Sequence, residues 1–267
     1  MANPGSDLTF LRLERPSDGV AVLTLDDPDR RNVMSDQMTE SWGRALAEIR
    51  ADRSVRVVVV TGAGTAFSSG GNTGWIASEP DATVDYLRTR MIAFYRAWLA
   101  IRELEVPTIA AVNGPAVGAG LCLALACDIR YASASARMSA PFVKLGMHPG
   151  MAATYLLADV VGGAQARELM LTGRMFGAEE ALRLGAVSRV FPDDEFADGV
   201  AEIAAGIAAN APIATRYTKL AMLEGHADFE SCVQWEALAQ PITLATADLQ
   251  EGIAAARAKR PPVFRGV

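Results

Sequence analysis

Two glycine-rich turns are the part of the sequence best suited to chemistry. The turns Gly62–Gly71 and Asn113–Gly120 each follow an apolar run that is typical of a buried strand. Glycine lets a ligand approach the backbone closely, and a turn that opens a helix leaves N–H groups without intrahelical partners. Such groups bind anions or a developing oxyanion, with support from the helix dipole. Two turns that converge on one point would form an oxyanion hole.

The sequences of these turns argue against several other sites. A dinucleotide fingerprint needs a third glycine where the first turn has Phe67, and the Lys-Ser/Thr pair of a P-loop is absent from both turns. Neither Ser68 nor Ser69 lies in a Gly-x-Ser-x-Gly nucleophile elbow. Tight connections without any function remain the alternative, because glycine-rich turns often only join two elements.

The elements around the turns predict an α/β fold. Strands that alternate with helices are typical of a parallel sheet with right-handed crossovers. The expected elements are a hairpin of Thr9–Leu13 and Val20–Leu25 with its turn at Arg15–Gly19, a helix from Ser35 to Arg50 with Ser35 as N-cap, a strand Val55–Thr61, a helix from Thr83 to Glu103, a strand Thr108–Val112, a helix Leu121–Ala126 and a strand Ile129–Ala132.

The C-terminal part of the chain predicts helices only. From Phe196 onward the strand signal disappears, and alanine-rich helical sequence extends to Arg260 without a low-complexity linker. We therefore expect a core of residues 1–195 that carries the site, and a helical oligomerisation region of residues 196–267. A chain of 267 residues that is 51% hydrophobic can bury a sizeable core.

Composition and charge limit the partners and the compartment. A net charge of -6 gives no general attraction to polyanions, so we expect no nucleic-acid partner. The three cysteines are scattered and the first residues do not resemble a signal peptide, which indicates reduced thiols in a cytoplasmic protein. The apolar stretch Pro107–Cys127 is long enough for a membrane span, but its Gly, Pro and Asn residues favour strand, loop and buried helix. No clustered ligand spacing indicates a metal site.

Six short motifs follow one another along nearly the whole chain. They are Arg31-Asn32-Val33-Met34-Ser35, Gly62-x-Gly64-x-Ala66-Phe67-Ser68-Ser69-Gly70-Gly71, Asn113-Gly114-x-Ala116-x-Gly118-Ala119-Gly120, Ala126-Cys127-Asp128, Pro149-Gly150 and Glu251-Gly252. In this order they resemble the crotonase (enoyl-CoA hydratase/isomerase) superfamily. The resemblance implies a crotonase-like spiral of ββα units, with a C-terminal helical region that assembles a homotrimer or a hexamer.

The same resemblance implies a site for an acyl-CoA thioester, with coenzyme A as part of the substrate and no separate cofactor. The oxyanion donors would be the backbone N–H groups of Gly71 and Ala119; Ala119 replaces the usual glycine but keeps the donor if its φ is negative. Arg31 would lie near the mouth of the site, and Lys259 would reach the nucleotide phosphates, unless each is only a solvated surface charge. The residues expected to line adenine and pantetheine lie within Ala66–Gly71 and include Ala66, Phe67, Ser69 and Gly70.

Three positions depart from the family's catalytic pattern. Hydratases of this family use two glutamates, and at those positions this chain has Cys122 and Phe142. A third position, where some relatives have a catalytic aspartate, is Gly150. Hydration of a double bond needs a base for the water and an acid for the α-carbon. Cys122 and Phe142 cannot supply that pair at neutral pH, and they would line the substrate pocket instead.

Other residues could replace the missing carboxylates. His148 precedes Pro149-Gly150 and is a candidate acid or base, or else a structural histidine bonded to a loop carbonyl. Cys122 could attack a thioester, although a packing role is favoured because no base is positioned beside it. Asn72 follows the oxyanion glycine and either contacts substrate or caps the next turn. His226 is expected to be a solvated turn residue.

Three functions therefore stay open. The first is an enoyl-CoA hydratase or isomerase relative with changed acid/base groups, for which ordinary hydration of crotonyl-CoA is expected to be poor. The second is a decarboxylase or another enolate-forming enzyme, since loss of carbon dioxide mainly needs a stabilised oxyanion and a dry pocket. The third is a non-catalytic acyl-CoA binding protein that keeps the fold and the cleft.

Overall fold

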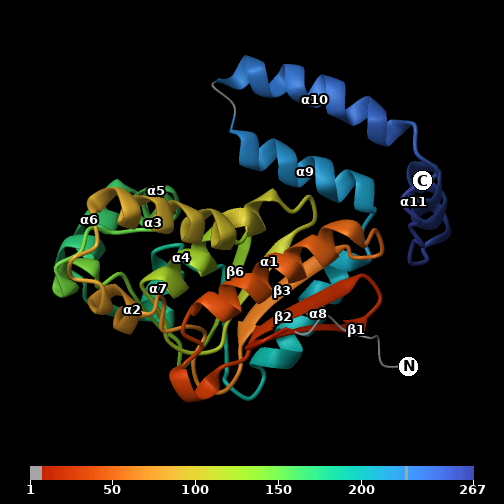
Figure 1. Cartoon of the computed structure of the whole chain (residues 1–267). Coiled ribbons are helices and arrows are strands. Elements are labelled where there is room, and N and C mark those ends of the chain that lie inside the picture. The colour runs from red at the N-terminus through yellow and green to blue at the C-terminus, as the bar shows by residue number, and fades with distance from the viewer. Residues whose placement is uncertain (1–7, 226–227) are drawn as a thin grey trace.

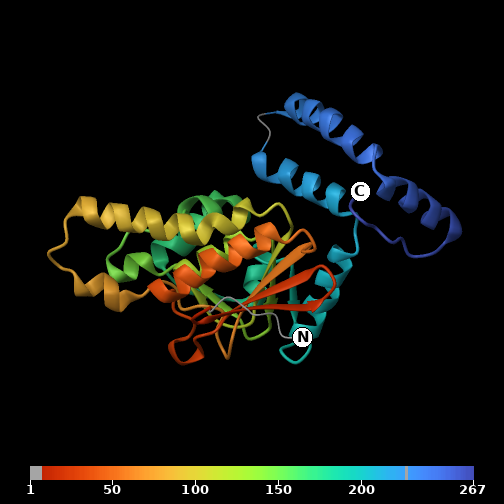
Figure 2. The ribbon, with the colours of Figure 1, turned by 45° about the vertical axis from the view of Figure 1, so that its right-hand side comes forward.

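The computed structural model describes residues 8–225 and 228–267, so His226 lies outside the described residues. Most of the chain forms an α/β body, from which the last helices extend (Figures 1 and 2). In chain order the elements are β1 (Leu11–Ser17), β2 (Val20–Leu25), η1 (Pro28–Arg30), α1 (Asp36–Ala51), β3 (Val57–Gly62), α2 (Thr73–Ser78), α3 (Val84–Leu99), η2 (Ala100–Glu103), β4 (Thr108–Val112), β5 (Ala116–Val117), α4 (Ala119–Ala126), β6 (Ile129–Ser133), β7 (Arg137–Ser139), η3 (Phe142–Leu145), α5 (Ala153–Val161), α6 (Gly163–Thr172), β8 (Met175–Gly177), α7 (Ala178–Arg183), β9 (Arg189–Phe191), α8 (Phe196–Ala208), α9 (Pro212–Glu224), α10 (Phe229–Leu244) and α11 (Ala247–Ala258).

A six-stranded sheet with helices on both faces forms the centre of the molecule. Its strand order is β1-β2-β3-β4-β6-β9; β1 is antiparallel to β2, and the other neighbours are parallel. One core cluster joins a face of the sheet to α1, α3 and α4, and a second cluster joins the opposite face to α8. The α/β fold class expected from alternating strands and helices is confirmed.

The expected elements are present, with shifted ends. Ser35 caps α1 by accepting a hydrogen bond from the Met38 N–H at 3.2 Å, as predicted. Strand β1 runs to Ser17, into the segment expected to be turn, because Gly19 supplies the positive φ of +76° that a tight turn requires. Helix α4 begins at Ala119, two residues earlier than predicted.

The parallel sheet brings the two glycine-rich turns together. Strands β3 and β4 are parallel neighbours, with Val58 opposite Thr108 and Val60 opposite Ala110. Their carboxyl ends therefore meet at the same edge of the sheet, where one turn leaves each strand. A bridge between Ser68 and Ala116 joins the turns directly. Backbone pairing alone therefore fixes the position of one turn relative to the other.

Of the C-terminal helices, α8 packs on the sheet, whereas α9, α10 and α11 lie outside the α/β body. Helix α8 covers the sheet through Phe196, Val200 and Ala204. Helices α9, α10 and α11 extend away from the body (Figures 1 and 2). The division of the chain at residue 196 stays a prediction. No helix in the described ranges 8–225 and 228–267 is both long and apolar enough to cross a membrane.

Candidate functional site

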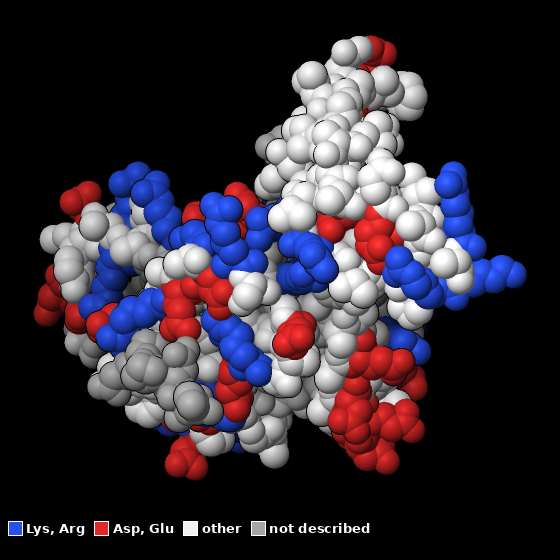
Figure 3. Space-filling model, turned by 90° about the vertical axis from the view of Figure 1, so that its right-hand side faces the viewer, with Lys and Arg blue, Asp and Glu red and all other residues white. Residues whose placement is uncertain are grey.

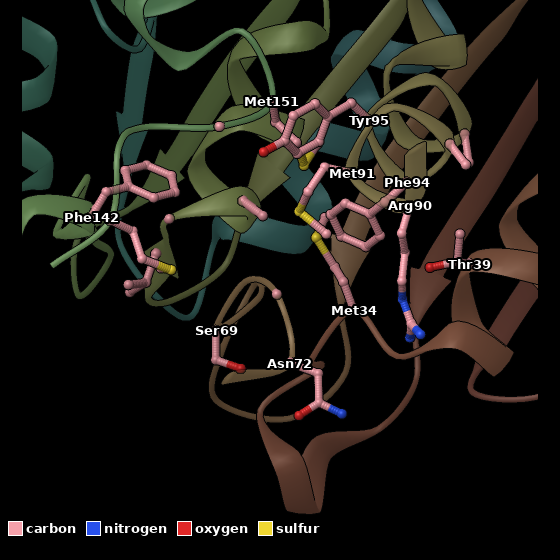
Figure 4. A pocket seen from close by; sticks show the side chains of 18 of the residues that line it. Met34, Thr39, Ser69, Asn72, Arg90, Met91, Phe94, Tyr95, Phe142 and Met151 are labelled. Carbon is pink, nitrogen blue, oxygen red and sulfur yellow. The ribbon is translucent and has the colours of Figure 1, made fainter. Parts of the chain in front are cut away.

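A cavity of about 530 Å³ lies between α1, α3 and the two glycine-rich turns. Gly71 ends the first turn, Ala119 lies in the second turn where α4 begins, and both line the cavity. Figure 4 shows Ser69 and Asn72 on one side of this space and the α3 side chains on another. Much of the wall is apolar, formed by Met34, Met91, Phe94, Phe142, Met147 and Met151.

Two asparagine side chains, of which Asn32 is buried and Asn113 partly buried, hold the first turn in shape. The Asn32 amide donates to the carbonyls of Ala63 and Ala66 at 2.9 and 2.7 Å and accepts from the Asp27 N–H at 2.9 Å. The Asn113 amide donates to the Gly62 carbonyl at 2.9 Å and accepts from the Gly62 N–H at 3.1 Å. These bonds satisfy backbone groups that the irregular loop leaves unpaired.

Gly70 is the point where the two turns touch. Its φ is +91°, and a Cβ added to it would collide with the Val117 carbonyl oxygen and lie 3.1 Å from the Ala119 nitrogen. Only glycine fits this position without a shift, because both the space and the backbone conformation exclude a side chain. The Met34 N–H donates to the Gly70 carbonyl at 2.9 Å, which ties the first turn to the start of α1. Gly71 follows directly and is therefore held close to the N-terminus of α4.

The N–H groups of Gly71 and Ala119 are available to a ligand. Within the described residues, neither donates a hydrogen bond to another group of the chain. Ala119 is the first residue of α4, where an N–H has no intrahelical partner. Its φ is not positive, so the replacement of glycine by alanine keeps the donor. Together with the positive end of the α4 dipole, these groups can stabilise a negatively charged oxygen.

Apolar or unreactive groups occupy two of the three positions where the resemblance implies catalytic carboxylates. Phe142 is buried and lines the cavity. Cys122 is buried, and burial raises the pKa of its thiol to about 12. A thiol with that pKa is protonated at neutral pH, so it is a poor nucleophile. Its Sγ lies 3.7 Å from the Gly150 carbonyl oxygen, and it does not line the cavity.

His148 and Asn72 both line the cavity. The Nδ1 of His148 lies 2.8 Å from the Pro149 carbonyl oxygen. A carbonyl oxygen can only accept a hydrogen bond, so Nδ1 is the protonated nitrogen that donates. In the neutral ring Nε2 then has a free lone pair. The Asn72 Oδ1 lies 3.1 Å from the position of a Cβ built on Gly74, in the first turn of α2. Each residue thus has a local contact and also lines the cavity, and a role of either one in catalysis or substrate binding stays a prediction.

The remaining residues expected at the site do not line the cavity. Ala66 and Phe67 are buried in the protein interior, and Gly70 contacts the second turn. The Arg31 side chain is exposed, and its carbonyl accepts from the Ser69 N–H at 2.8 Å, so its backbone supports the first turn. Lys259 ends α11 and is exposed, on a helix that extends away from the body.

Sequence reasoning missed the contribution of α1 and α3 to the cavity. Trp42 of α1 stacks on Trp98 of α3 with ring centroids 4.8 Å apart, and the Trp98 Nε1 donates to Thr39 at 2.9 Å. This packing turns Arg90 and Tyr95 of α3 toward the cavity. Arg90 forms an ion pair with Asp36 at 2.9 Å. No motif marked these residues, because helix α3 has the pattern of any amphipathic helix.

Among the described residues, no group of three or more His, Cys, Asp or Glu side chains is arranged so that it could hold a metal ion. The arrangement therefore offers two backbone donors, an apolar chamber and a few titratable side chains. Such a site can bind a carbonyl compound and stabilise an enolate or another oxyanion derived from it.

Comparison with known proteins gives consistent similarities. Residues 15–267 match the family model described as "Enoyl-CoA hydratase/isomerase". A protein of Mycobacterium tuberculosis named "Probable enoyl-CoA hydratase EchA12" is 40% identical over 267 residues, covering 97% of this chain and 94% of that protein. The solved structure of an enoyl-CoA hydratase from Bacillus anthracis has a TM-score of 0.91 and 31% identity, covering 97% of this chain and 100% of that one. The solved structure of an enoyl-CoA hydratase/carnithine racemase from Magnetospirillum magneticum has a TM-score of 0.87 and 33% identity, covering 98% of this chain and 97% of that one.

Proposed function

Since the chain belongs to the enoyl-CoA hydratase/isomerase family, we propose that it binds an acyl-CoA thioester and processes it through a thioester enolate. The thioester carbonyl oxygen accepts hydrogen bonds from the N–H groups of Gly71 and Ala119. As negative charge develops on this oxygen, the two donors bind it more strongly than they bind the ground-state carbonyl.

The contact between the two turns at Gly70 is the observation that carries this proposal. Gly70, which no other residue can replace without a shift, lies against the Ala119 nitrogen. The next residue, Gly71, supplies the second donor. The two N–H groups point to no other acceptor among the described residues. Both lie on a cavity whose largely apolar walls lower the local dielectric constant, which strengthens hydrogen bonds to an oxyanion.

Ordinary hydration is not the reaction that this site favours. Neither Cys122 nor Phe142 can activate water or protonate carbon at neutral pH, and each such role contributes about two to four powers of ten. The carboxylates on the cavity wall, Asp36 and Glu40, have highly exposed side chains. Decarboxylation of a malonyl-type thioester is the second candidate, because it forms the enolate without a protein base. The apolar lining favours it, since a transition state whose negative charge is spread toward the thioester oxygen loses less solvation there than the localised charge of a carboxylate ground state.

Contacts with the rest of coenzyme A are part of the same proposal. Ser69 lines the cavity, and Arg31 lies on the exposed side of the first turn, where it can meet the pantetheine or the phosphates. Lys259 follows directly after α11, a helix that lies outside the α/β body (Figure 2), so we infer that it would reach the nucleotide of a neighbouring subunit in a trimer.

The test is mass spectrometry of crotonyl-CoA and malonyl-type CoA esters after incubation with the pure protein, beside calorimetric measurement of thioester binding. We expect binding of both, loss of carbon dioxide from the malonyl-type ester, and hydration of crotonyl-CoA slower than that of an ordinary hydratase by several powers of ten. Binding without any turnover would indicate a carrier. Hydration at an ordinary rate that His148→Ala leaves unchanged would contradict the roles assigned to positions 122 and 142.

A further inference from the structure

Tyr95 is a titratable side chain on the cavity wall to which the proposed function gives no role. It projects from α3, and its ring lies against Gly150. A Cβ built on Gly150 would lie 2.9 Å from Cζ and 3.2 Å from Cε1 of Tyr95, and closer still to its hydroxyl oxygen. The hydroxyl thus occupies the space that a side chain at position 150 would need.

The surroundings of this hydroxyl leave it free to act on a ligand. In the described ranges 8–225 and 228–267 no hydrogen-bond partner faces it, and its one ring contact is with Phe94. Figure 4 shows the hydroxyl pointing toward the side of the cavity where Phe142 lies. The neighbouring Cys122 is a thiol, which accepts hydrogen bonds only weakly.

The other titratable groups on the wall are less suited to the same task. Asp36 is engaged by Arg90 at 2.9 Å, and its side chain is 85% exposed. The Glu40 side chain is 73% exposed, and His148 is also exposed. Tyr95 is half-buried beside the apolar wall, where water competes less for a proton.

We propose that Tyr95 is the proton donor that converts the thioester enolate into the product thioester. This inference rests on the proposed function, which supplies the enolate. The electron pair of the enolate double bond forms the new bond between the α-carbon and hydrogen, while the O–H bond of Tyr95 breaks. The Tyr95 phenolate then takes a proton from water and releases hydroxide, which restores the hydroxyl. Proton, charge and electrons balance without a metal or an additional oxidant.

The acidity of Tyr95 agrees with a donor rather than a base. Desolvation raises the pKa of Tyr95, and the neighbouring Cys122 raises it further. The hydroxyl therefore stays protonated through neutral pH, and a donor role is lost only in the alkaline range, above the ordinary pKa of tyrosine. We expect turnover to be flat from neutral to mildly alkaline pH and to fall beyond it.

Tyr95→Phe removes the hydroxyl and keeps the ring that packs against Gly150. The control is Tyr155→Phe, because Tyr155 is 64% exposed and does not line this cavity. Both variants and the unmodified protein are compared for melting temperature, thioester affinity and turnover of a methylmalonyl-type CoA ester in D2O. We expect Tyr95→Phe to bind within about two-fold of the unmodified protein and to turn over about 10² to 10³ times more slowly. Its residual product would carry deuterium on both faces of the α-carbon, whereas the unmodified protein would deuterate one face.

The outcomes separate this inference from the proposed function. Full turnover by Tyr95→Phe with one-faced deuteration would overturn the donor role and leave the proposed function standing. Equal losses of affinity and turnover in Tyr95→Phe would overturn the donor role and indicate that Tyr95 only packs against its neighbours. If the unmodified protein binds thioesters but turns over none, the donor role fails and only binding remains. If it binds none, the proposed function fails, and the donor role fails with it.

Discussion

At the scale of single residues, the role proposed for Ala119 depends on its backbone and not on its side chain. The proposed donor is its N–H at the first position of α4, where proline is well tolerated by a helix. Ala119→Pro should therefore remove one hydrogen bond to the oxyanion with little loss of stability. We expect turnover to fall by about two to three powers of ten, measured with any thioester that the protein converts. Ala119→Gly keeps the N–H and should retain most of the activity; equal activity of a folded proline variant would contradict the assignment.

Burial makes Cys122 unsuited to nucleophilic attack, although cysteine is a residue type that can act as a nucleophile. Its pKa of about 12 keeps the thiol protonated at neutral pH, because an ionised sulfur would lose its solvation in this apolar site. Iodoacetamide at pH 7 should leave Cys122 unmodified in the folded protein and label it after denaturation, as measured by peptide mass spectrometry. Cys122→Ala should lower turnover by no more than a few-fold. A loss of several powers of ten at unchanged affinity would indicate that the thiol takes part in the reaction.

At the scale of elements, the loop that follows β3 depends on bonds to side chains distant in sequence. Asn32→Ala would leave the Asp27 N–H and the Ala63 and Ala66 carbonyls without this partner in a buried site. Each such loss costs about 1–3 kcal/mol, and alanine at the positive φ of this position adds strain. We expect the free energy of unfolding to fall by about 3 kcal/mol in urea denaturation.

The same change should weaken thioester binding, because the loop that ends at Gly71 loses part of its support. Asn210→Ala is the matched control, since Asn210 is exposed and should change stability by less than about 0.5 kcal/mol. A stable Asn32→Ala protein with normal thioester affinity would show that the loop keeps its shape without this side chain.

At the scale of the whole molecule, the C-terminal helices leave a large apolar surface open. Met222, Phe229 and Leu238 are 81%, 82% and 76% exposed. In Figure 3 the upper part of the molecule, where α9 and α10 lie, is largely free of charged side chains. Burial of such side chains contributes about 25 cal/mol per Å², so we expect copies of this chain to associate through these helices.

We expect a homotrimer or a hexamer at micromolar concentration in sedimentation velocity experiments. Phe229→Glu combined with Leu238→Glu should shift the protein toward monomers, because it places charge in the expected interface. Glu202→Gln, on α8, is a control change on the body and should leave the assembly intact. A stable monomer of the unmodified protein would contradict this expectation.

The sequence by itself determined the fold class, the family resemblance and the two turns. These features are local: β-branched runs, a capping serine and glycine patterns depend on neighbours along the chain. The same locality explains why strand β4 (Thr108–Val112) and the cap at Ser35 agree with the expected positions. The short strands β5, β7 and β8 were not predicted, because two or three residues carry no measurable periodicity.

Only the tertiary structure decided which side chains face the cavity. Phe67 and Ala66 lie in a motif beside Ser69, yet the fold turns them into the interior. Tyr95 lies in no motif, yet the packing of α1 on α3 places it against Gly150, 55 positions further along the chain. The physical reason is that contacts between elements distant in sequence depend on helix packing and strand order, which no local pattern encodes.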